Sequence, residues 1–208
     1  MQDTPESIYR DFEKVCDDSL TAYFDACKLY NEPPPRISLA MRDMLVEHIL
    51  LNLFVKWEFF LENLCIAYML GYQDMNGATL TRYVYPKNRD HALMLIQNGK
   101  QYPDWTQISS VTNYSRMFFE NGPFEALQGM NLITEIKTIR NAIAHASGTA
   151  AAKFASLVRG KNIPMSDEMT PVRFLCANRP HRTQTYCEYY IEYLCDAAGM
   201  LAGKPAQE

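Results

Sequence analysis

The chain has 208 residues, of which 48% are apolar and 21% are charged; this composition excludes intrinsic disorder and suits one globular domain over residues 1–208. Its 24 acidic and 20 basic residues give a net charge of −4, which excludes a uniformly basic protein that coats nucleic acid. The charge is uneven, because residues 135–182 hold 8 basic and 3 acidic residues and carry a net charge of +5. This basic segment indicates either a local anion-binding patch or an ordinary solvated surface.

Two long helices are predicted at the start of the chain. Thr4 resembles a helix cap and Pro5 suits the first helical position, and the apolar residues that follow recur every three or four positions through residues 5–31. Prolines at 33–35 end this helix, because proline lacks the backbone N–H that a helix needs. A second helix is predicted over residues 38–70.

The apolar stretch 48–70 within the second helix is long enough to span a membrane. Lys56, Glu58 and Glu62 lie inside it, and each charge would cost a few kcal/mol in hydrocarbon, so a core helix of a bundle is expected and no membrane contact. Glu58 and Glu62 are one helical turn apart and could together ligate a metal ion. The E-x-x-H partners of a di-metal site are missing, so a buried ion pair with a basic residue such as Arg140, or an interface contact, is expected in preference to a metal site.

The rest of the chain is predicted to be mainly helical. Val172 to Ala177 alone has the character of a strand, and it suggests one short β-hairpin near residues 160–180. The fold class is therefore an all-α helical bundle with at most that hairpin. The further helices are expected at residues 90–97, 109–121, 124–128, 131–146, 150–158 and 183–202.

The cysteines and the N-terminus bear on the cellular compartment. No cysteine pair has the C-x-x-C spacing, and most of the six lie in apolar helical runs, so reduced core residues are expected. A zinc site is the alternative, but its spacing matches no common ligand pattern. The first residues contain neither a basic stretch nor an apolar one, which predicts a cytoplasmic protein. The residues of that alternative zinc site are Cys176, His181, Cys187 and Cys195.

One motif with chemical content, Arg140-Asn141-x-x-x-His145, lies in the basic segment on the helix predicted over 131–146. At about 100° per residue, Asn141 and His145 point away from the apolar side of that helix. Arg140 starts near the apolar edge, from which its long side chain can reach the imidazole. The apolar side is formed by Leu132, Ile136, Ile139 and Ile143, and small residues that would let a second helix or a second copy approach are Ala142, Ala144 and Ala146.

These residue types suit RNA cleavage without a metal. A histidine can take a proton from a ribose 2′-OH or give one to a leaving 5′-oxygen, and an arginine can hold the phosphate. The structural alternative is that His145 lies in a last helical turn, where the helix dipole favours a cation, and that Asn141 only bonds to it.

The last predicted helix carries a stripe of tyrosines. This stripe is expected to belong to the core or to an interface, and not to form a surface on which bases stack. That stripe comprises Tyr186, Tyr189, Tyr190 and Tyr193.

The motif Arg140-Asn141-Ala-Ile-Ala-His145 resembles the R-x4-6-H signature of the HEPN superfamily, in the form with asparagine after the arginine. The run from Trp57 to Glu62 resembles the Trp-Glu pattern of the RiboL-PSP-type HEPN subgroup. The resemblance implies a HEPN-like bundle that dimerises so that two motifs meet in one cleft. It also implies a metal-independent endoribonuclease without a cofactor, acting as a toxin or a defence effector.

Carried over to this chain, the resemblance makes His145 the general acid and base, Arg140 the phosphate ligand and Asn141 the residue that orients His145. Lys137 in the same basic segment is a candidate for substrate binding. The expected partners are an RNA substrate, a second copy of the chain and an antitoxin or other protein. The alternative is a non-catalytic HEPN-like module that uses the same helix for dimerisation and binding.

Overall fold

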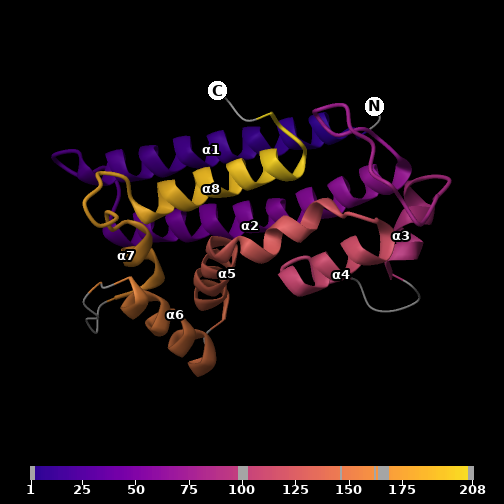
Figure 1. Cartoon of the computed structure of the whole chain (residues 1–208). Helices are drawn as coiled ribbons and strands as arrows, with labels where there is room; N and C mark the ends of the chain where they lie inside the picture. The colour runs from indigo at the N-terminus through magenta and orange to yellow at the C-terminus, as the bar shows by residue number, and fades with distance from the viewer. Residues whose placement is uncertain (1–2, 98–102, 146, 162, 164–168, 206–208) are drawn as a thin grey trace. The chain divides into compact units, whose positions relative to one another are not determined.

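The computed structural model (Figure 1) describes residues 3–97, 103–145, 147–161, 163 and 169–205. Within these ranges the protein is helical and contains no β-sheet, which confirms the all-α prediction. None of the helices in these ranges is long and apolar enough to cross a membrane. The elements are α1 (Pro5–Asn31), α2 (Leu39–Leu70), α3 (Arg89–Gln97), α4 (Ile108–Phe118), the 3-10 helix η1 (Pro123–Gly129), α5 (Asn131–Ala144), α6 (Gly148–Gly160), α7 (Pro171–Leu175) and α8 (Tyr186–Leu201).

Local caps explain where the longest helices begin. The backbone N–H of Ser7 donates to Thr4 Oγ1 at 3.2 Å, as the Thr4-Pro5 signal predicted. Helix α8 begins three residues later than expected, because Thr185 and Glu188 form a reciprocal capping box. In it, the Thr185 N–H donates to Glu188 Oε2 at 2.8 Å, and the Glu188 N–H donates to Thr185 Oγ1 at 3.3 Å.

The predicted strand over residues 172–177 is wrong, because residues 171–175 form helix α7. Thr170 caps this helix by accepting a hydrogen bond from the Arg173 N–H at 3.2 Å, and Pro171 occupies the first turn. No hairpin is present among the described residues of 160–180, where residues 162 and 164–168 lie outside the description. The expected end of α5 at Ala146 also lies outside the described residues.

The chain divides into two compact units, each with its own core. Unit 1 contains Met1–Lys14, Lys56–Asn131 and Cys195–Glu208, so it includes α3, α4 and η1. Its centre is an aromatic cluster in which Phe12 lies 5.7 Å from Trp57 and 5.2 Å from Phe60, measured between ring centroids. These aromatic rings bury most of their surface and stabilise the unit through the hydrophobic effect.

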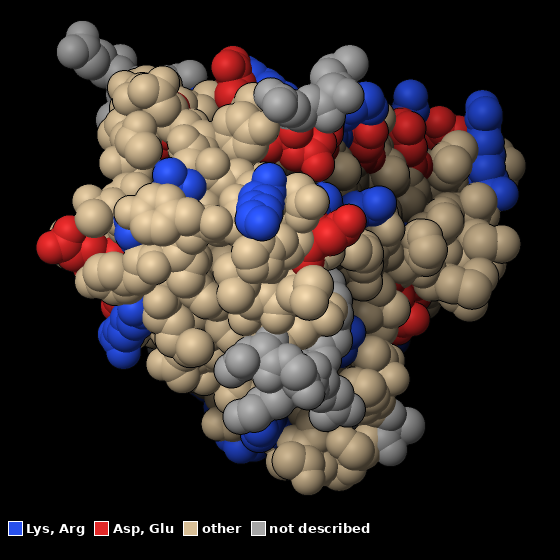
Figure 2. Space-filling view, turned by 90° about the vertical axis from the view of Figure 1, so that its right-hand side faces the viewer, with Lys and Arg blue, Asp and Glu red and all other residues tan. Residues whose placement is uncertain are grey.

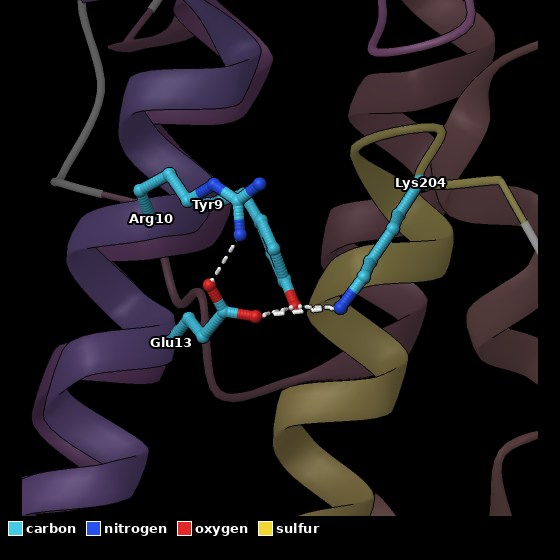
Figure 3. A network of polar contacts seen from close by, with 4 residues as sticks. All are labelled: Tyr9, Arg10, Glu13 and Lys204. Carbon is cyan, nitrogen blue, oxygen red and sulfur yellow. Dashed lines mark hydrogen bonds and ion pairs between the residues drawn. The ribbon is translucent and has the colours of Figure 1, made fainter. Parts of the chain in front are cut away.

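A polar network in unit 1 joins the first helix to the segment after α8 (Figure 3). The Tyr9 hydroxyl donates to Glu13 Oε1 at 2.6 Å, and Lys204 Nζ donates to the Tyr9 oxygen at 2.7 Å. Arg10 Nη1 lies 2.7 Å from the other carboxylate oxygen of Glu13. The hydrogen bonds from Tyr9 and Arg10 lower the pKa of Glu13 to about 2.

Unit 2 contains Val15–Val55 and Leu132–Leu194, and therefore holds α5, α6 and α7. Within it, the α8 segment lies beside the α1 segment (Figure 1), and the Tyr23 hydroxyl donates to Thr185 Oγ1 at 3.0 Å. Its core includes a stack in which the rings of Phe174 and Tyr186 lie 4.4 Å apart. This unit contains the whole Arg140 to His145 motif.

Candidate functional site

Helix α5 carries the motif and is held on two sides within unit 2. Its apolar side is buried through Ile133, Ile136 and Ile139, close to the predicted stripe. On another side, Glu135 accepts a hydrogen bond from Lys161 Nζ at 2.8 Å and one from the Tyr190 hydroxyl at 2.9 Å. One carboxylate therefore connects α5 to the residue that caps the end of α6 and to α8.

Arg140 lies half-buried against the ring of Phe54, with its guanidinium carbon 6.0 Å from the ring centroid. Its Nη1 donates to Asn141 Oδ1 at 3.0 Å. Its Nε is buried and has no hydrogen-bond partner, and Arg140 has no ion pair with any residue that the structure describes. A buried donor without an acceptor costs about 1–3 kcal/mol, and an anion that reached the guanidinium would remove that cost.

His145 is exposed immediately after the end of α5. Its backbone N–H donates to the Asn141 carbonyl at 3.0 Å, so helical hydrogen bonding continues to this residue. The side-chain oxygen of Asn141 accepts from Arg140, and no hydrogen bond from Asn141 to the imidazole exists among the described residues. The exposure of His145 agrees with its expected position away from the apolar side of the helix.

Lys137 is half-buried on α5, one turn before Arg140 and Asn141. Its position on the helix places it between Asn141 and the buried Ile133, at the flank of the buried side. The exposed imidazole of His145 therefore lies on the side of α5 that faces away from its core, whereas Arg140 lies at the edge of the buried side, against Phe54. A phosphate at this surface would meet cationic donors and a group that can transfer protons.

Charged side chains of both signs are mixed on the face of the protein that corresponds to the right-hand side of Figure 1. Figure 2 shows one face of the protein, on which uncharged residues predominate and Lys, Arg, Asp and Glu side chains are interspersed. The blue and red side chains on this face form no extended area of a single charge sign.

Other candidates from the sequence have different surroundings. Glu62 is buried in unit 1, where its Oε2 accepts from Trp105 Nε1 at 3.0 Å and its Oε1 lies 3.9 Å from Arg89. Burial raises the pKa of Glu62, and Trp105 and Arg89 oppose that rise. Among the residues with described positions, no three His, Cys, Asp or Glu side chains are placed to hold a metal ion.

A hollow of about 210 Å³ in unit 1 contains an arginine whose charge is already compensated. Arg89 donates to Asn63 Oδ1 at 2.6 Å and lies 3.7 Å from Asp3 Oδ2. This arginine differs from Arg140, which forms no ion pair with any residue that the structure describes. The hollow is lined by Asp3, Asn63, Ile66, Ala67, Leu70, Tyr72 and Arg89.

The tyrosine stripe of α8 belongs largely to the core of unit 2. Tyr186 and Tyr190 are buried, and Tyr189 and Tyr193 are half-buried. Tyr186 stacks on Phe174, and the Tyr190 hydroxyl is occupied by Glu135. The stripe is therefore part of the packing, as its helical spacing indicated, and not an open surface for stacked bases.

Three residues that position the motif could not be predicted from the sequence. Phe54 lies under Arg140, and Lys161 and Tyr190 fix the neighbouring Glu135. These contacts join residues that are far apart in the chain, so neither spacing nor composition could identify them.

The chain matches no protein-family model, no curated protein and no solved structure.

Proposed function

We propose that this protein is a metal-independent endoribonuclease of HEPN type, acting as a toxin or defence effector. The observation that carries the proposal is that the Arg140 guanidinium lacks an anionic partner. Its guanidinium has a buried Nε without a partner, and no carboxylate among the described residues neutralises it, while His145 is exposed on the same short segment. A cation held without an anionic partner, near the same end of α5 as an accessible imidazole, suits a phosphodiester substrate.

The roles follow from the chemistry of each group. Arg140 binds the scissile phosphate and stabilises the charge that develops on its oxygens as the 2′-oxygen attacks. His145 takes the proton of the ribose 2′-OH or protonates the leaving 5′-oxygen. Asn141 holds the Arg140 guanidinium through the bond at 3.0 Å, and Lys137 contributes to binding of the RNA backbone.

The direct test is cleavage of a mixed pool of RNA by the purified chain in the presence of EDTA. We expect cleavage to survive the chelator and to leave 2′,3′-cyclic phosphate and 5′-hydroxyl ends. Arg140→Ala and His145→Ala should each lower the rate by at least about 100-fold, the usual scale for losing such a group. Cleavage that needs a metal, or that persists in both variants, would contradict the proposal.

Two matched variants control for charge and residue type. Arg159 is exposed near the end of α6, and His48 is exposed on α2, both within unit 2. Arg159→Ala and His48→Ala remove one arginine and one histidine without altering α5. Both should retain the rate of the unchanged protein, and circular dichroism checks that all four variants keep their helices.

If two copies of the chain form a composite site, a mixture of two inactive variants should regain activity. Ala144 and His145 are exposed, and their surface at the end of α5 gives a second copy room to approach. If the Arg140 of one copy works with the His145 of the other, mixing the two inactive variants produces mixed dimers with one complete site. Random exchange should then restore about a quarter of the activity. A mixture as inactive as its components would assign each site to a single copy.

A non-catalytic binding module is the second candidate, and one observation favours it. The Arg140 side chain packs on Phe54 and bonds to Asn141, which are contacts that a purely structural arginine also makes. On this hypothesis Arg140→Ala lowers the free energy of unfolding, and the protein shows no RNA cleavage under any condition. Expression of the protein in growing cells adds a further measurement, because a ribonuclease toxin arrests growth and its His145→Ala variant does not.

A further inference from the structure

The hollow in unit 1 has an apolar wall that the end of α2 provides. Ile66, Ala67 and Leu70 line it together with Asn63, and spacings of three and four residues place these side chains on one face of the helix. Ile66 and Ala67 are buried, whereas Leu70 is half-buried at the last residue of α2. This wall therefore offers apolar surface to a ligand and carries one amide, that of Asn63.

Tyr72 adds an aromatic side chain to the lining because of the way in which α2 ends. The Gly71 N–H donates to the Tyr68 carbonyl at 3.0 Å, and the Tyr72 N–H donates to the Ala67 carbonyl at 3.1 Å. These two hydrogen bonds form a Schellman motif, in which Gly71 adopts the left-handed conformation with a φ of 91°. The chain therefore turns at Gly71, and the turn fixes the backbone of Tyr72 against the last turn of α2.

Arg89 supplies a positive charge to the lining of the hollow. It is the first residue of α3, and this helix is capped by Asn88, whose Oδ1 accepts from the His91 N–H at 2.9 Å. Arg89 Nη2 donates to Asn63 Oδ1 at 2.6 Å and lies 3.9 Å from Glu62 Oε1. Both contacts are made by Nη2, so they hold the planar guanidinium in place while Nη1 keeps its donors.

Asp3 adds a negative charge to the same lining, and it forms only a loose pair with Arg89. Arg89 Nη1 lies 3.7 Å from Asp3 Oδ2, whereas a hydrogen bond between such groups measures about 2.7–3.2 Å. The side chains of Arg89 and Asp3 are 41% and 62% exposed, and exposed ion pairs contribute little to stability. Nη1 has no hydrogen bond to any residue within the described ranges. Both groups can therefore exchange their mutual contact for contacts with a ligand.

We propose that this hollow binds a free α-amino acid with an apolar side chain, for which leucine is the probe. Such a ligand carries both an ammonium group and a carboxylate at neutral pH. The carboxylate accepts from Arg89 Nη1, and the ammonium group pairs with Asp3. The apolar side chain of the ligand lies against the wall that α2 provides, where it is removed from water.

The charges and the size of the hollow favour this class of ligand. The lining holds one charge of each sign, so a ligand with a single charge would satisfy one of the two groups and be repelled by the other. Sites for drug-sized ligands usually measure about 300–1,000 Å³. The hollow of about 210 Å³ therefore suits a smaller molecule such as a single amino acid. The inference is independent of the proposed nuclease activity, because the hollow lies in unit 1 and the Arg140 to His145 motif lies in unit 2.

Isothermal titration calorimetry of the full chain with leucine is the direct test. Three analogues each lack one feature of leucine, because isocaproate has no ammonium group, isoamylamine has no carboxylate, and glycine has no apolar side chain. We expect leucine to bind at least about tenfold more tightly than each analogue, since every missing group removes one contact with the lining. Absence of leucine binding, or an analogue that binds as tightly as leucine, would overturn the proposal.

Variants of the two charged residues locate the binding site. Arg89→Gln and Asp3→Asn should each weaken leucine binding at least about tenfold, because each removes one charged partner of the ligand. The matched controls Arg116→Gln and Asp104→Asn change exposed residues of unit 1 that do not line the hollow, and both should keep the affinity of the unchanged protein. Unchanged affinity in both lining variants, or an equal loss in the controls, would contradict the proposal. Circular dichroism confirms that each variant is folded before titration.

Discussion

The carboxylate of Glu13 offers a quantitative test of the polar network in unit 1 (Figure 3). Replacing it in Glu13→Gln removes the negative charge that the Tyr9 hydroxyl, Arg10 and Lys204 stabilise. The pKa of Glu13 falls from its ordinary value of 4.5 to about 2, and each pKa unit corresponds to about 1.4 kcal/mol. The full difference would be about 3 kcal/mol. Because Arg10 is more than half exposed and solvent screens the pair, we expect about 1 kcal/mol.

The sign of the pH dependence follows from the depressed pKa. The folded protein favours the ionised form of Glu13, so this stabilisation is complete above the ordinary pKa of 4.5 and disappears as the pH falls towards 2. The difference in free energy of unfolding between the unchanged protein and Glu13→Gln should therefore be largest near neutral pH. It should shrink steadily below about pH 4.5.

Urea unfolding followed by far-ultraviolet circular dichroism measures this difference at a series of pH values. Glu6 is exposed on the same helix, and Glu6→Gln serves as the matched control, with a small and nearly constant effect. A difference for Glu13→Gln that stays constant from neutral pH to about pH 3 would refute the reasoning, because its origin could not then be the charge. High salt should reduce the effect of Glu13→Gln.

Two further predictions concern packing and a buried hydrogen bond, and urea unfolding measures both. A Cβ at Gly122 would lie 1.6 Å from the Oγ of Ser115, which is fully buried, so Gly122→Ala should destabilise the protein by more than about 2 kcal/mol. Gly129→Ala, where a Cβ meets open space, should change stability little, and equal effects of the two would contradict the clash. Tyr190→Phe loses the bond to Glu135 and should cost about 1 kcal/mol, whereas an unchanged stability would mean that Lys161 alone satisfies the carboxylate.

Patterns among neighbouring residues predicted most of the helix positions. They also caused the main error, which is the strand expected over residues 172–177. Thr4 and Pro5 predicted the start of α1 correctly, because capping depends on neighbours in sequence. Thr170 and Pro171 carry the same type of signal, but the alternation after them resembled a strand. In α7, Val172 and Phe174 are buried and Arg173 is exposed, and such a short helix has the same pattern as a strand.

For the candidate site, the sequence predicted on which side of the helix a side chain lies, but not which distant residues it contacts. Helical geometry predicted that His145 points away from the apolar side of its helix, and His145 is exposed. The bond between Arg140 and Asn141 involves neighbours in the chain, but the Phe54 ring against the guanidinium comes from a different helix. No periodic pattern in one sequence encodes such a tertiary contact. The endoribonuclease role itself stays a prediction that rests on the motif.

The aromatic cores differ between the two units in a way that affects optical spectroscopy. Both tryptophans of the chain, Trp57 and Trp105, lie in unit 1, whereas unit 2 contains a cluster of tyrosine and phenylalanine rings. Tryptophan emission therefore reports the environment of unit 1, and a tryptophan in place of Phe154 would report unit 2. Superimposable unfolding curves from the two probes would describe one cooperative transition, and separate midpoints would describe two folding units within a single chain.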